Sequence, residues 1–404
     1  MKITKIEVYR LFPRKVKPIQ ISDGVKDDDV ITPVVCRIYT DEGIYGDGEA
    51  AMAYNVGADT VQHMTAEFAR KIIGMDPLEN EVIWNKIYRQ SFWALNGGVV
   101  TTAAMSAIDN ACWDIRGKYF GVPVYELLGG AMRTELRSYA SQLQNGWSYR
   151  AGSALTPDDF AESARVAVAE GYDAIKVNFF TQAPSGKTYS DDERRGFPSP
   201  AFMNEIEARV KATRDAVGPN VDIIAECHAM TDPQSLIRFA ERMEKYNLLA
   251  LEEPCNPEPA LYKYIASRIS TPLAGGERVY TRAQFLPYLL DGSIRLLQPD
   301  IGTAGGITEI KKICDLADTF GVGVQIHTAG TPVEIAAALQ VEAAIPNFTI
   351  HENLIWPLYE EYLELGKYPV EMANGKVYVP DRPGLGNELS DFALSHADIL
   401  TVTE

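Results

Sequence analysis

Short apolar runs between residues 224 and 352 end repeatedly in an ionisable side chain, at intervals of about 25 residues. The residues at these ends are Glu226, Glu252, Glu277, Asp300, His327 and Glu352. An interval of this length is too long for a hairpin but suits one strand plus one returning helix. We therefore expect a repeated βα unit that places a polar group just beyond each buried strand, where α/β barrels carry their chemistry.

The three glutamates predict a metal site. Neighbouring strands of a barrel lie roughly 4.7–4.9 Å apart, so the carboxylates of Glu226, Glu252 and Glu277 would converge and repel one another. A hard divalent cation relieves that repulsion, and carboxylate and water oxygens are the ligands that Mg²⁺ prefers. Each glutamate alone is more simply a solvated acid. All three on one repeat favour a site for one Mg²⁺ per subunit.

Two histidines are candidates for proton transfer. Asp300 ends the strand before His327, so its carboxylate can bond one ring nitrogen and make the other a base. His228 follows Glu226 by two residues and points to the same side of its strand, which could place it opposite His327. His327 taken alone could equally be a buried structural histidine. We assign no role to His63 or His396, and we expect His351 to face away from Glu352.

Lys176 and Asn178 share one face of another predicted strand, because side chains alternate along a strand. Lys176 is a candidate partner for a substrate carboxylate, although an isolated lysine is nearly as often a solvated side chain. Residues 181 to 199, the next connection in the chain, are unusually long and polar and hold several Gly and Pro residues. A connection of that length in a compact domain is typically functional or disordered.

The elements that must position these residues divide the chain into three parts. Strands over 3–11, 30–39 and 44–49, followed by helices over 60–73, 77–91 and 99–117, predict an α+β domain. The barrel pattern begins with a strand over 136–144, a helix over 157–171, a strand over 174–180 and a helix over 200–217. We place the first domain at residues 1–130, the barrel at 131–366 and a packing C-terminal segment at 367–404.

Chain length, net charge and cysteine content limit the classes of function that the chain can have. With 404 residues the chain is too long for one ordinary domain. A formal charge of −17 argues against nucleic acids and anionic membranes as partners. Five scattered cysteines without a CxxC pair favour a reducing cytoplasm, and neither an export signal nor a long apolar span is evident.

Several motifs carry a family resemblance over nearly the whole chain. They are Glu252-Glu253-Pro254, Gly276-Glu277-Arg278, Gln298-Pro299-Asp300, Ala304-Gly305-Gly306-Ile307-Thr308, Ala107-Ile108-Asp109 and Trp113-Asp114-Ile115. Together they resemble the enolase superfamily, and within it the mandelate racemase group. The resemblance implies an α/β fold: a (β/α)7β TIM-like barrel with an N-terminal α+β capping domain that the C-terminal segment completes. It also implies one essential Mg²⁺ and abstraction of the proton next to a carboxylate.

The resemblance also implies a role for each residue. The metal ligands fall on Glu226, Glu252 and Glu277, the His–Asp pair on His327 and Asp300, and the substrate-carboxylate glutamate on Glu352. Arg278 of the Gly-Glu-Arg motif belongs to the substrate-binding set. The family's KxK motif is here Lys176-Val177-Asn178, so a second basic residue is replaced by an amide that cannot accept a proton.

That replacement favours dehydration over racemisation. A racemase needs a base on each face of the substrate, whereas a dehydratase needs one base and one acid, for which His327 and His228 suffice. The KxN motif and the histidine after the first metal ligand resemble galactonate, gluconate and mannonate dehydratases. We therefore expect loss of water from a sugar acid to give a 2-keto-3-deoxy acid.

Other interpretations remain open. A two-histidine epimerase or racemase and a cycloisomerase share the same fold, and a barrel that only binds or regulates is a further alternative. For substrate specificity we expect the segments 13–29 and 49–54 of the capping domain to touch the distal hydroxyls. Trp356 and the connection 181–199 are expected to add to the same wall. A homo-oligomer is the default assembly for the family.

Overall fold

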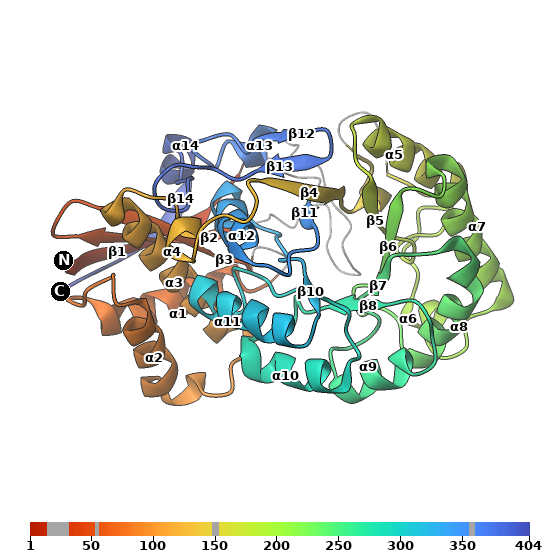
Figure 1. Cartoon of the computed structure of the whole chain (residues 1–404), viewed down its shortest axis with the longest axis horizontal. Coiled ribbons are helices and arrows are strands. Elements are labelled where there is room, and N and C mark those ends of the chain that lie inside the picture. The colour runs from red at the N-terminus through yellow and green to blue at the C-terminus, as the bar shows by residue number, and fades with distance from the viewer. Residues whose placement is uncertain (14–31, 53–55, 148–152, 355–359) are drawn as a thin grey trace.

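The computed structural model describes residues 1–13, 32–52, 56–147, 153–354 and 360–404. An antiparallel sheet with its helices lies at one end of the molecule, and a barrel of parallel strands fills the rest (Figure 1). This is the predicted α/β architecture of a barrel with an N-terminal capping domain, and the prediction is confirmed. No helix in the described ranges has both the length and the apolar character to cross a membrane.

The capping domain is built on a four-stranded sheet in the order β14-β1-β2-β3. Its strands are β1 (Ile3–Leu11), β2 (Val34–Thr40), β3 (Tyr45–Ala50) and β14 (Ala397–Thr403). The helices α1 (Ala58–Ile72), α2 (Asn80–Gln90) and α3 (Val99–Phe120) pack beside this sheet. Helix α3 approaches β3 so closely that a Cβ on Gly46 or Gly48 would lie 2.2 Å from a backbone oxygen of α3. Glycine is therefore required there for contact.

Within the described residues, the barrel has eight strands separated by seven principal helices. The strands are β4 (Glu135–Ala140), β5 (Ala174–Asn178), β6 (Asp222–Glu226), β7 (Ala250–Glu252), β8 (Leu273–Gly275), β9 (Leu296–Leu297), β10 (Gly323–Val324) and β11 (His351–Asn353). The helices are α5 (Pro157–Ala169), α7 (Pro200–Val217), α8 (Pro233–Met243), α9 (Pro259–Ala266), α10 (Thr281–Asp291), α11 (Gly306–Thr319) and α12 (Pro332–Ala344). Parallel pairing of β11 with β4 and a bridge between Val324 and Phe348 close the ring.

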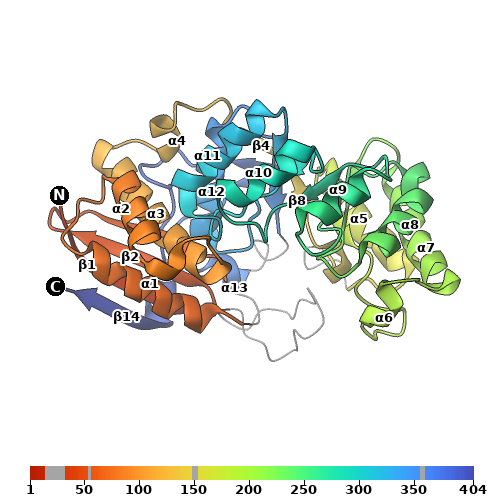
Figure 2. The same ribbon diagram turned by 90° about the horizontal axis from the view of Figure 1, so that it is seen from below.

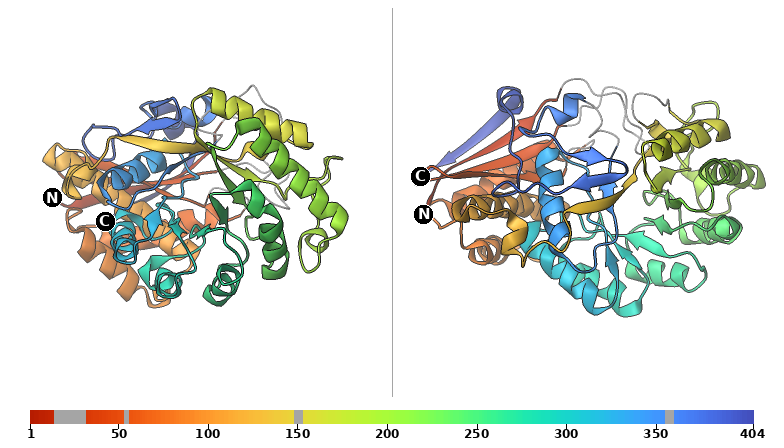
Figure 3. Two further views of the ribbon diagram at one scale, coloured as in Figure 1. Left: turned by 45° about the vertical axis from the view of Figure 1, so that its right-hand side comes forward. Right: turned by 45° about the horizontal axis from the view of Figure 1, so that its top comes forward.

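The helices of the barrel begin at recognisable sequence signals. Thr156, Ser199, Asp232 and Thr331 each cap a helix whose first residue is proline. The cap side chain accepts an N–H that has no partner within the helix, and proline fits the first turn because its missing N–H is not needed there. These helices lie outside the strands, as the two views of Figure 3 show. The strand ends therefore open on one face of the barrel.

Short elements complete the chain. They are α4 (Val124–Leu127), α6 (Asp191–Arg194), α13 (Glu360–Leu363), α14 (Asp391–Ser395), β12 (Met372–Ala373), β13 (Lys376–Tyr378) and the 3-10 turns Phe92–Ala94, Leu143–Asn145 and Glu244–Tyr246. The connection 181–199 holds α6 and a bridge between Gln182 and Thr188. The first barrel strand ends at Ala140 rather than at 144, because Gln142 adopts a left-handed conformation with φ 62°.

The C-terminal segment contacts both parts of the molecule. Strand β13 pairs with the barrel strand β4, whereas β14 pairs with β1 along seven residues from Lys5 to Leu11. Figure 2 shows β14 beside β1 at the end of the molecule where both termini lie. The C-terminal strand thus completes the sheet of the capping domain. The domain boundaries at 130 and 366 stay predictions.

Helix α3 of the capping domain holds the start of α11 and Gly305, the residue just before it. The carboxylate of Asp109 accepts hydrogen bonds from the backbone N–H (2.8 Å) and hydroxyl (2.6 Å) of Thr308. Asn110 accepts from the N–H of Ile307 at 2.9 Å, and Ser106 accepts from that of Gly305 at 2.9 Å. The motif around Asp109 and the Ala-Gly-Gly-Ile-Thr motif are therefore two halves of one buried contact between the domains.

Replacing Asp109 tests this contact. We expect Asp109→Ala to lower the free energy of unfolding, because an unsatisfied buried donor costs roughly 1–3 kcal/mol and the change leaves two. Urea denaturation followed by circular dichroism measures the effect. The control is Asp315→Ala on the exposed side of α11, whose ion pair with Lys311 we expect to contribute less than about 1 kcal/mol. Equal effects of the two changes would contradict the buried contact.

Candidate active site

The three predicted metal ligands lie together at the carboxyl ends of neighbouring strands. Glu226 ends β6 and is paired in register with Glu252 at the end of β7, while Glu277 comes two residues after β8. One carboxylate oxygen from each lies within 4.8 Å of those of the others. Glu226 and Glu252 are fully buried, and the side chain of Glu277 is 13% exposed. Parallel pairing thus produces the convergence that the sequence predicts.

Lys176 lies among these carboxylates. Its ammonium is 2.5 Å from Glu252 Oε1, 2.7 Å from Glu352 Oε1 and 3.3 Å from Glu226 Oε2. The lysine is 1% exposed, so it is not a solvated side chain. Glu352, at the end of β11, also accepts from the hydroxyl of Ser141 at 2.8 Å. Burial alone would raise the pKa of Glu352, but the positive charges of Lys176 and His327 lower that pKa to about 2.

A divalent cation fits this donor set. Burial raises the pKa of Glu252 to about 8, and the charge of Glu226 adds to the shift while Lys176 opposes it. The Oε2 atom of Glu226 is buried without a hydrogen bond and has only ion-pair contacts. Three carboxylates with such an inward oxygen are the ligands a hard cation takes, and binding one offsets their mutual repulsion. Glu226, Glu252 and Glu277 are therefore the residues that would hold it.

His327 and Asp300 form the predicted pair. The Nδ1 atom of His327 lies 2.6 Å from Asp300 Oδ2, and its Nε2 atom lies 3.3 Å from Glu277 Oε2. The other carboxylate oxygen of Asp300 accepts from the N–H of Gly302 at 2.8 Å. Burial by itself would lower the pKa of His327, but the charges of Glu277, Glu352 and Asp300 raise it to about 10. A cation at the three glutamates would offset part of that effect.

His228 lies at the other end of the carboxylate group. Its Nε2 atom is 3.7 Å from Glu226 Oε2, and its side chain is 6% exposed. Its backbone has a φ of 46°, and its N–H donates to Glu226 Oε1 at 2.7 Å. Burial lowers the pKa of His228 to about 4, so the ring is neutral near pH 7. The two histidines therefore approach opposite members of the glutamate group, Glu226 and Glu277.

The remaining predicted residues have different placements. Arg278 lies beside the site, with its guanidinium 2.8 Å from Glu277 Oε1 and in an ion pair with Glu253. Asn178 contacts His228, whereas Trp356 and residues 14–31 and 53–55 lie outside the described residues. His351 points away from the barrel centre, as expected, but it is buried against Glu342 at 2.7 Å. The roles of Lys176, Asn178, Arg278 and Glu352 toward a substrate stay predictions.

The expectation that the segment 49–54 touches substrate hydroxyls stays a prediction, and the structure shows what Glu49 itself contacts. Glu49 is fully buried at the end of β3, and its carboxylate accepts from the backbone N–H of Thr331 at 3.0 Å and from the hydroxyl of the same residue. Burial raises the pKa of Glu49 to about 8. This residue therefore holds the loop after His327.

A buried amide network supports the site and was not predicted. The Nε2 atom of Gln298 donates to Glu252 Oε2 at 2.6 Å and to Gln325 Oε1 at 2.5 Å. Tyr139 also donates to Gln325 Oε1, at 3.2 Å. The signal was present, since Gln298 and Gln325 each precede a site residue, Asp300 and His327, by the two-residue period of a strand.

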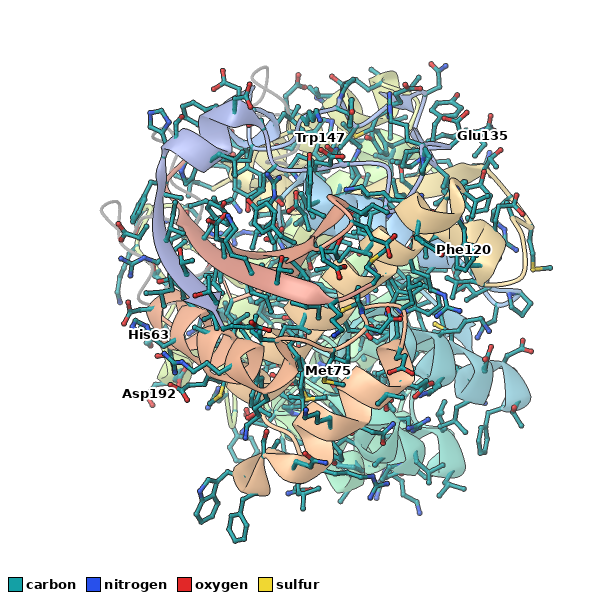
Figure 4. The ribbon with its side chains drawn as sticks, turned by 90° about the vertical axis from the view of Figure 1, so that its left-hand side faces the viewer. His63, Met75, Phe120, Glu135, Trp147 and Asp192 are labelled. Atoms are coloured by element: carbon teal, nitrogen blue, oxygen red, sulfur yellow. The ribbon has the colours of Figure 1, made fainter. Side chains whose placement is uncertain are left out.

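Histidines without an expected role lie outside this site. His63 is on the exposed side of α1, at the outer face of the capping domain (Figure 4). Its Nδ1 atom lies 2.9 Å from the carbonyl oxygen of Asp59 in the same helix. His396 comes directly after α14, and its ring stacks on Phe392 with 4.2 Å between the centroids.

Comparison with known families and structures identifies the class. The family described as mandelate racemase / muconate lactonizing enzyme, N-terminal domain, matches residues 5–129. The family described as enolase C-terminal domain-like matches residues 159–393. A solved member of the enolase superfamily from Salmonella Typhimurium superposes with a TM-score of 0.93 at 42% identity, covering 99% of both chains. The chain belongs to the enolase superfamily, in its mandelate racemase group.

Named relatives are also similar over long stretches. A D-galactonate dehydratase of Variovorax paradoxus is 32% identical over 98% of this chain and 94% of its own length. A D-gluconate dehydratase of Thermoproteus tenax is 34% identical over 89% of this chain and 69% of its own length. The 3,6-anhydro-D-galactonate cycloisomerase from Zobellia galactanivorans has a TM-score of 0.80 at 27% identity, covering 98% of this chain and all of its own.

Gln298 gives a test of the metal site that does not depend on turnover. We expect Gln298→Leu to weaken Mg²⁺ or Mn²⁺ binding about 10–100-fold, because groups that orient a metal ligand typically contribute that much. Isothermal titration calorimetry measures the dissociation constant. Gln62→Leu is the control, since Gln62 is equally buried but bonds backbone oxygens in the capping domain. Unchanged cation affinity in Gln298→Leu would show that Gln298 does not orient Glu252.

Proposed function

We propose that this protein is a Mg²⁺-dependent dehydratase of a sugar acid, an aldonate such as galactonate, gluconate or mannonate. The reaction removes the C2 proton and the C3 hydroxyl and gives a 2-keto-3-deoxy acid. The observation that carries the proposal is the pair of histidines at opposite ends of the glutamate group, one with a carboxylate on Nδ1 and one with an amide. The names of the dehydratase relatives support the same reaction class.

We assign residues to each step of this reaction. Lys176 could donate to one oxygen of a substrate carboxylate, and Glu352, 2.7 Å from Lys176, could bind the other oxygen once Glu352 carries a proton. When bound, the cation supplies electrostatic stabilisation for the charge that develops on that carboxylate. Nε2 of His327 accepts the C2 proton, and Asp300 holds the ring and stabilises the imidazolium that results. His228 donates a proton to the departing C3 hydroxyl.

Other reactions fit the site less well. A racemase of the mandelate type needs a lysine base on the second face, and the amide of Asn178 cannot accept a proton. A two-histidine epimerase, with His228 as the second base, is an alternative that the substrate screen separates. Cycloisomerisation is the second candidate, favoured by the resemblance to the anhydrogalactonate cycloisomerase. A barrel that only binds would have no use for three ligands, a His–Asp pair and a second histidine held together in one place. Location in the cytoplasm and assembly as a homo-oligomer remain predictions.

A substrate screen tests the reaction directly. The protein is stripped with EDTA, reconstituted with Mg²⁺ and incubated with a library of hexonates, pentonates and aldarates, and 2-keto acids are measured by a carbonyl-trapping absorbance assay. We expect a keto acid from at least one aldonate, and none without the cation. Full activity in the metal-free protein would contradict the proposed site. A changed sugar acid without keto acid would indicate an epimerase.

Asparagine replacements separate the roles of the two histidines. We expect His327→Asn to lose both dehydration and exchange of the C2 proton with solvent, and His228→Asn to lose dehydration but keep the exchange. General acid–base groups typically contribute about 10²–10⁴-fold in rate. His63→Asn is the matched control and should be unaffected, because His63 lies on the surface of the capping domain. Near wild-type dehydration in either site variant would remove that histidine from the mechanism.

A further inference from the structure

The two histidines of the site have chemically opposite partners on the same ring atom. Nδ1 of His327 faces a carboxylate oxygen of Asp300 at 2.6 Å, whereas Nδ1 of His228 faces the amide nitrogen of Asn178 at 3.2 Å. A carboxylate only accepts hydrogen bonds, and an amide nitrogen only donates them. Nδ1 of His327 must therefore carry a hydrogen, while Nδ1 of His228 must present its lone pair.

The orientation of the Asn178 amide is fixed by the backbone. Its Oδ1 atom accepts from the N–H of Phe180 at 2.9 Å, and the residue is fully buried. Turning the amide over would place its NH₂ group against that N–H and leave a buried donor unsatisfied, at a cost of roughly 1–3 kcal/mol. The nitrogen of Asn178 therefore faces His228.

A second amide approaches the other ring nitrogen. Gln142 Nε2 lies 3.4 Å from His228 Nε2, and Oε1 of Gln142 contacts Gln144 Nε2 at 2.5 Å. A neutral imidazole accepts at one nitrogen only. Two contacts favour Nδ1 as the acceptor: the distance from Asn178 is the shorter one, and Nε2 also faces the carboxylate of Glu226 at 3.7 Å.

We propose that Asn178 is a positioning residue that holds His228 in the tautomer with its hydrogen on Nε2, opposite to the tautomer that Asp300 imposes on His327. The inference rests on the proposed function and deepens it. His327 can then accept a proton at its Nε2 atom, and His228 can donate a proton from its own Nε2 atom. The difference between the acid and the base comes from the atom that faces Nδ1. That atom is the amide nitrogen of Asn178 at His228 and a carboxylate oxygen of Asp300 at His327.

The proposed step balances. His327 takes the C2 proton, the C3–O bond breaks with its electron pair on oxygen, and that oxygen takes the Nε2 hydrogen of His228 and leaves as water. Both nitrogens of His228 are then acceptors, and the NH₂ groups of Asn178 and Gln142 face one each. The enol left behind gains a proton at C3, and its C2 hydroxyl gives up the proton that restores His228. His327 releases the proton it took to solvent, and C3 takes its new proton from solvent.

The tautomers are observable by nuclear magnetic resonance with ¹⁵N-labelled histidine on the Mg²⁺-reconstituted protein, because a ring nitrogen bearing hydrogen is well separated from a bare one. The chain has 5 histidines, and His228→Asn identifies the signals of His228. We expect hydrogen on Nε2 of His228. His351, which has a carboxylate on Nδ1, serves as the reference for the opposite tautomer. Hydrogen on Nδ1 of His228, or on both nitrogens, would overturn the proposal.

Asn178→Asp is the decisive variant, because a carboxylate accepts where the amide donates. We expect the hydrogen of His228 to move to Nδ1, the signals of His327 to stay unchanged, and dehydration to fall at least about 100-fold while exchange of the C2 proton continues. An unmoved tautomer in this variant would contradict the inference. Failure of the wild-type protein to dehydrate any sugar acid would overturn the proposed function and leave the tautomer result standing.

Discussion

Repulsion between buried like charges is the constraint on which the rest of the site depends. Glu226 and Glu252 end adjacent strands in register, and Glu277 joins them, so three carboxylates lie within 4.8 Å in a region closed to water. Such a group is unfavourable unless cations and hydrogen-bond donors surround it. Part of the negative charge is offset by Lys176, Gln298 and the backbone N–H groups after Glu226. A bound divalent cation would offset the remainder. A substrate carboxylate would bring a further negative charge into this group, and the same cations and donors would have to offset it.

The capping domain contributes to the catalytic geometry through the barrel's shortest strands. Strands β9 and β10, which precede Asp300 and His327, have two residues each. The segments that follow these strands are held from outside the barrel, by Asp109 at Thr308 and by Glu49 at Thr331. Positioning of the base therefore depends on contacts between domains as well as on the barrel itself. The motif around Asp109 therefore contributes to the site although it lies far in sequence from the three glutamates.

Periodicity and charge were enough to predict the barrel and the core of the site. The barrel was predicted from the repeat of about 25 residues, and the site from the strand-end positions of Glu226, Glu252, Glu277, Asp300 and His327. Neutral amides at strand ends, such as Gln298, carry a weaker signal, which is their spacing of two residues from a charged site residue. The left-handed turn at Gln142 and the burial of Glu49 arise from tertiary contacts. Periodicity could not show them.

The proposed roles of His228 and His327 differ because the fold places different residues beside their rings. Parallel strands bring His228 and His327 to opposite ends of one carboxylate group, and the residue beside each ring sets what it can do. Replacing the family's second lysine with Asn178 removes a base and supplies a donor to His228. In the proposed mechanism, this one substitution at a strand end favours elimination over racemisation.

Reaction in D₂O with an aldonate substrate tests the central claim most directly. Dehydration through the enol places one solvent deuterium at C3 of a 2-keto-3-deoxy acid, because C3 takes its new hydrogen after the hydroxyl has left. The account predicts that product, with the deuterium in a single stereochemical position. Deuterium at C2 of a sugar acid that retains its C3 hydroxyl, with no keto acid formed, would contradict it.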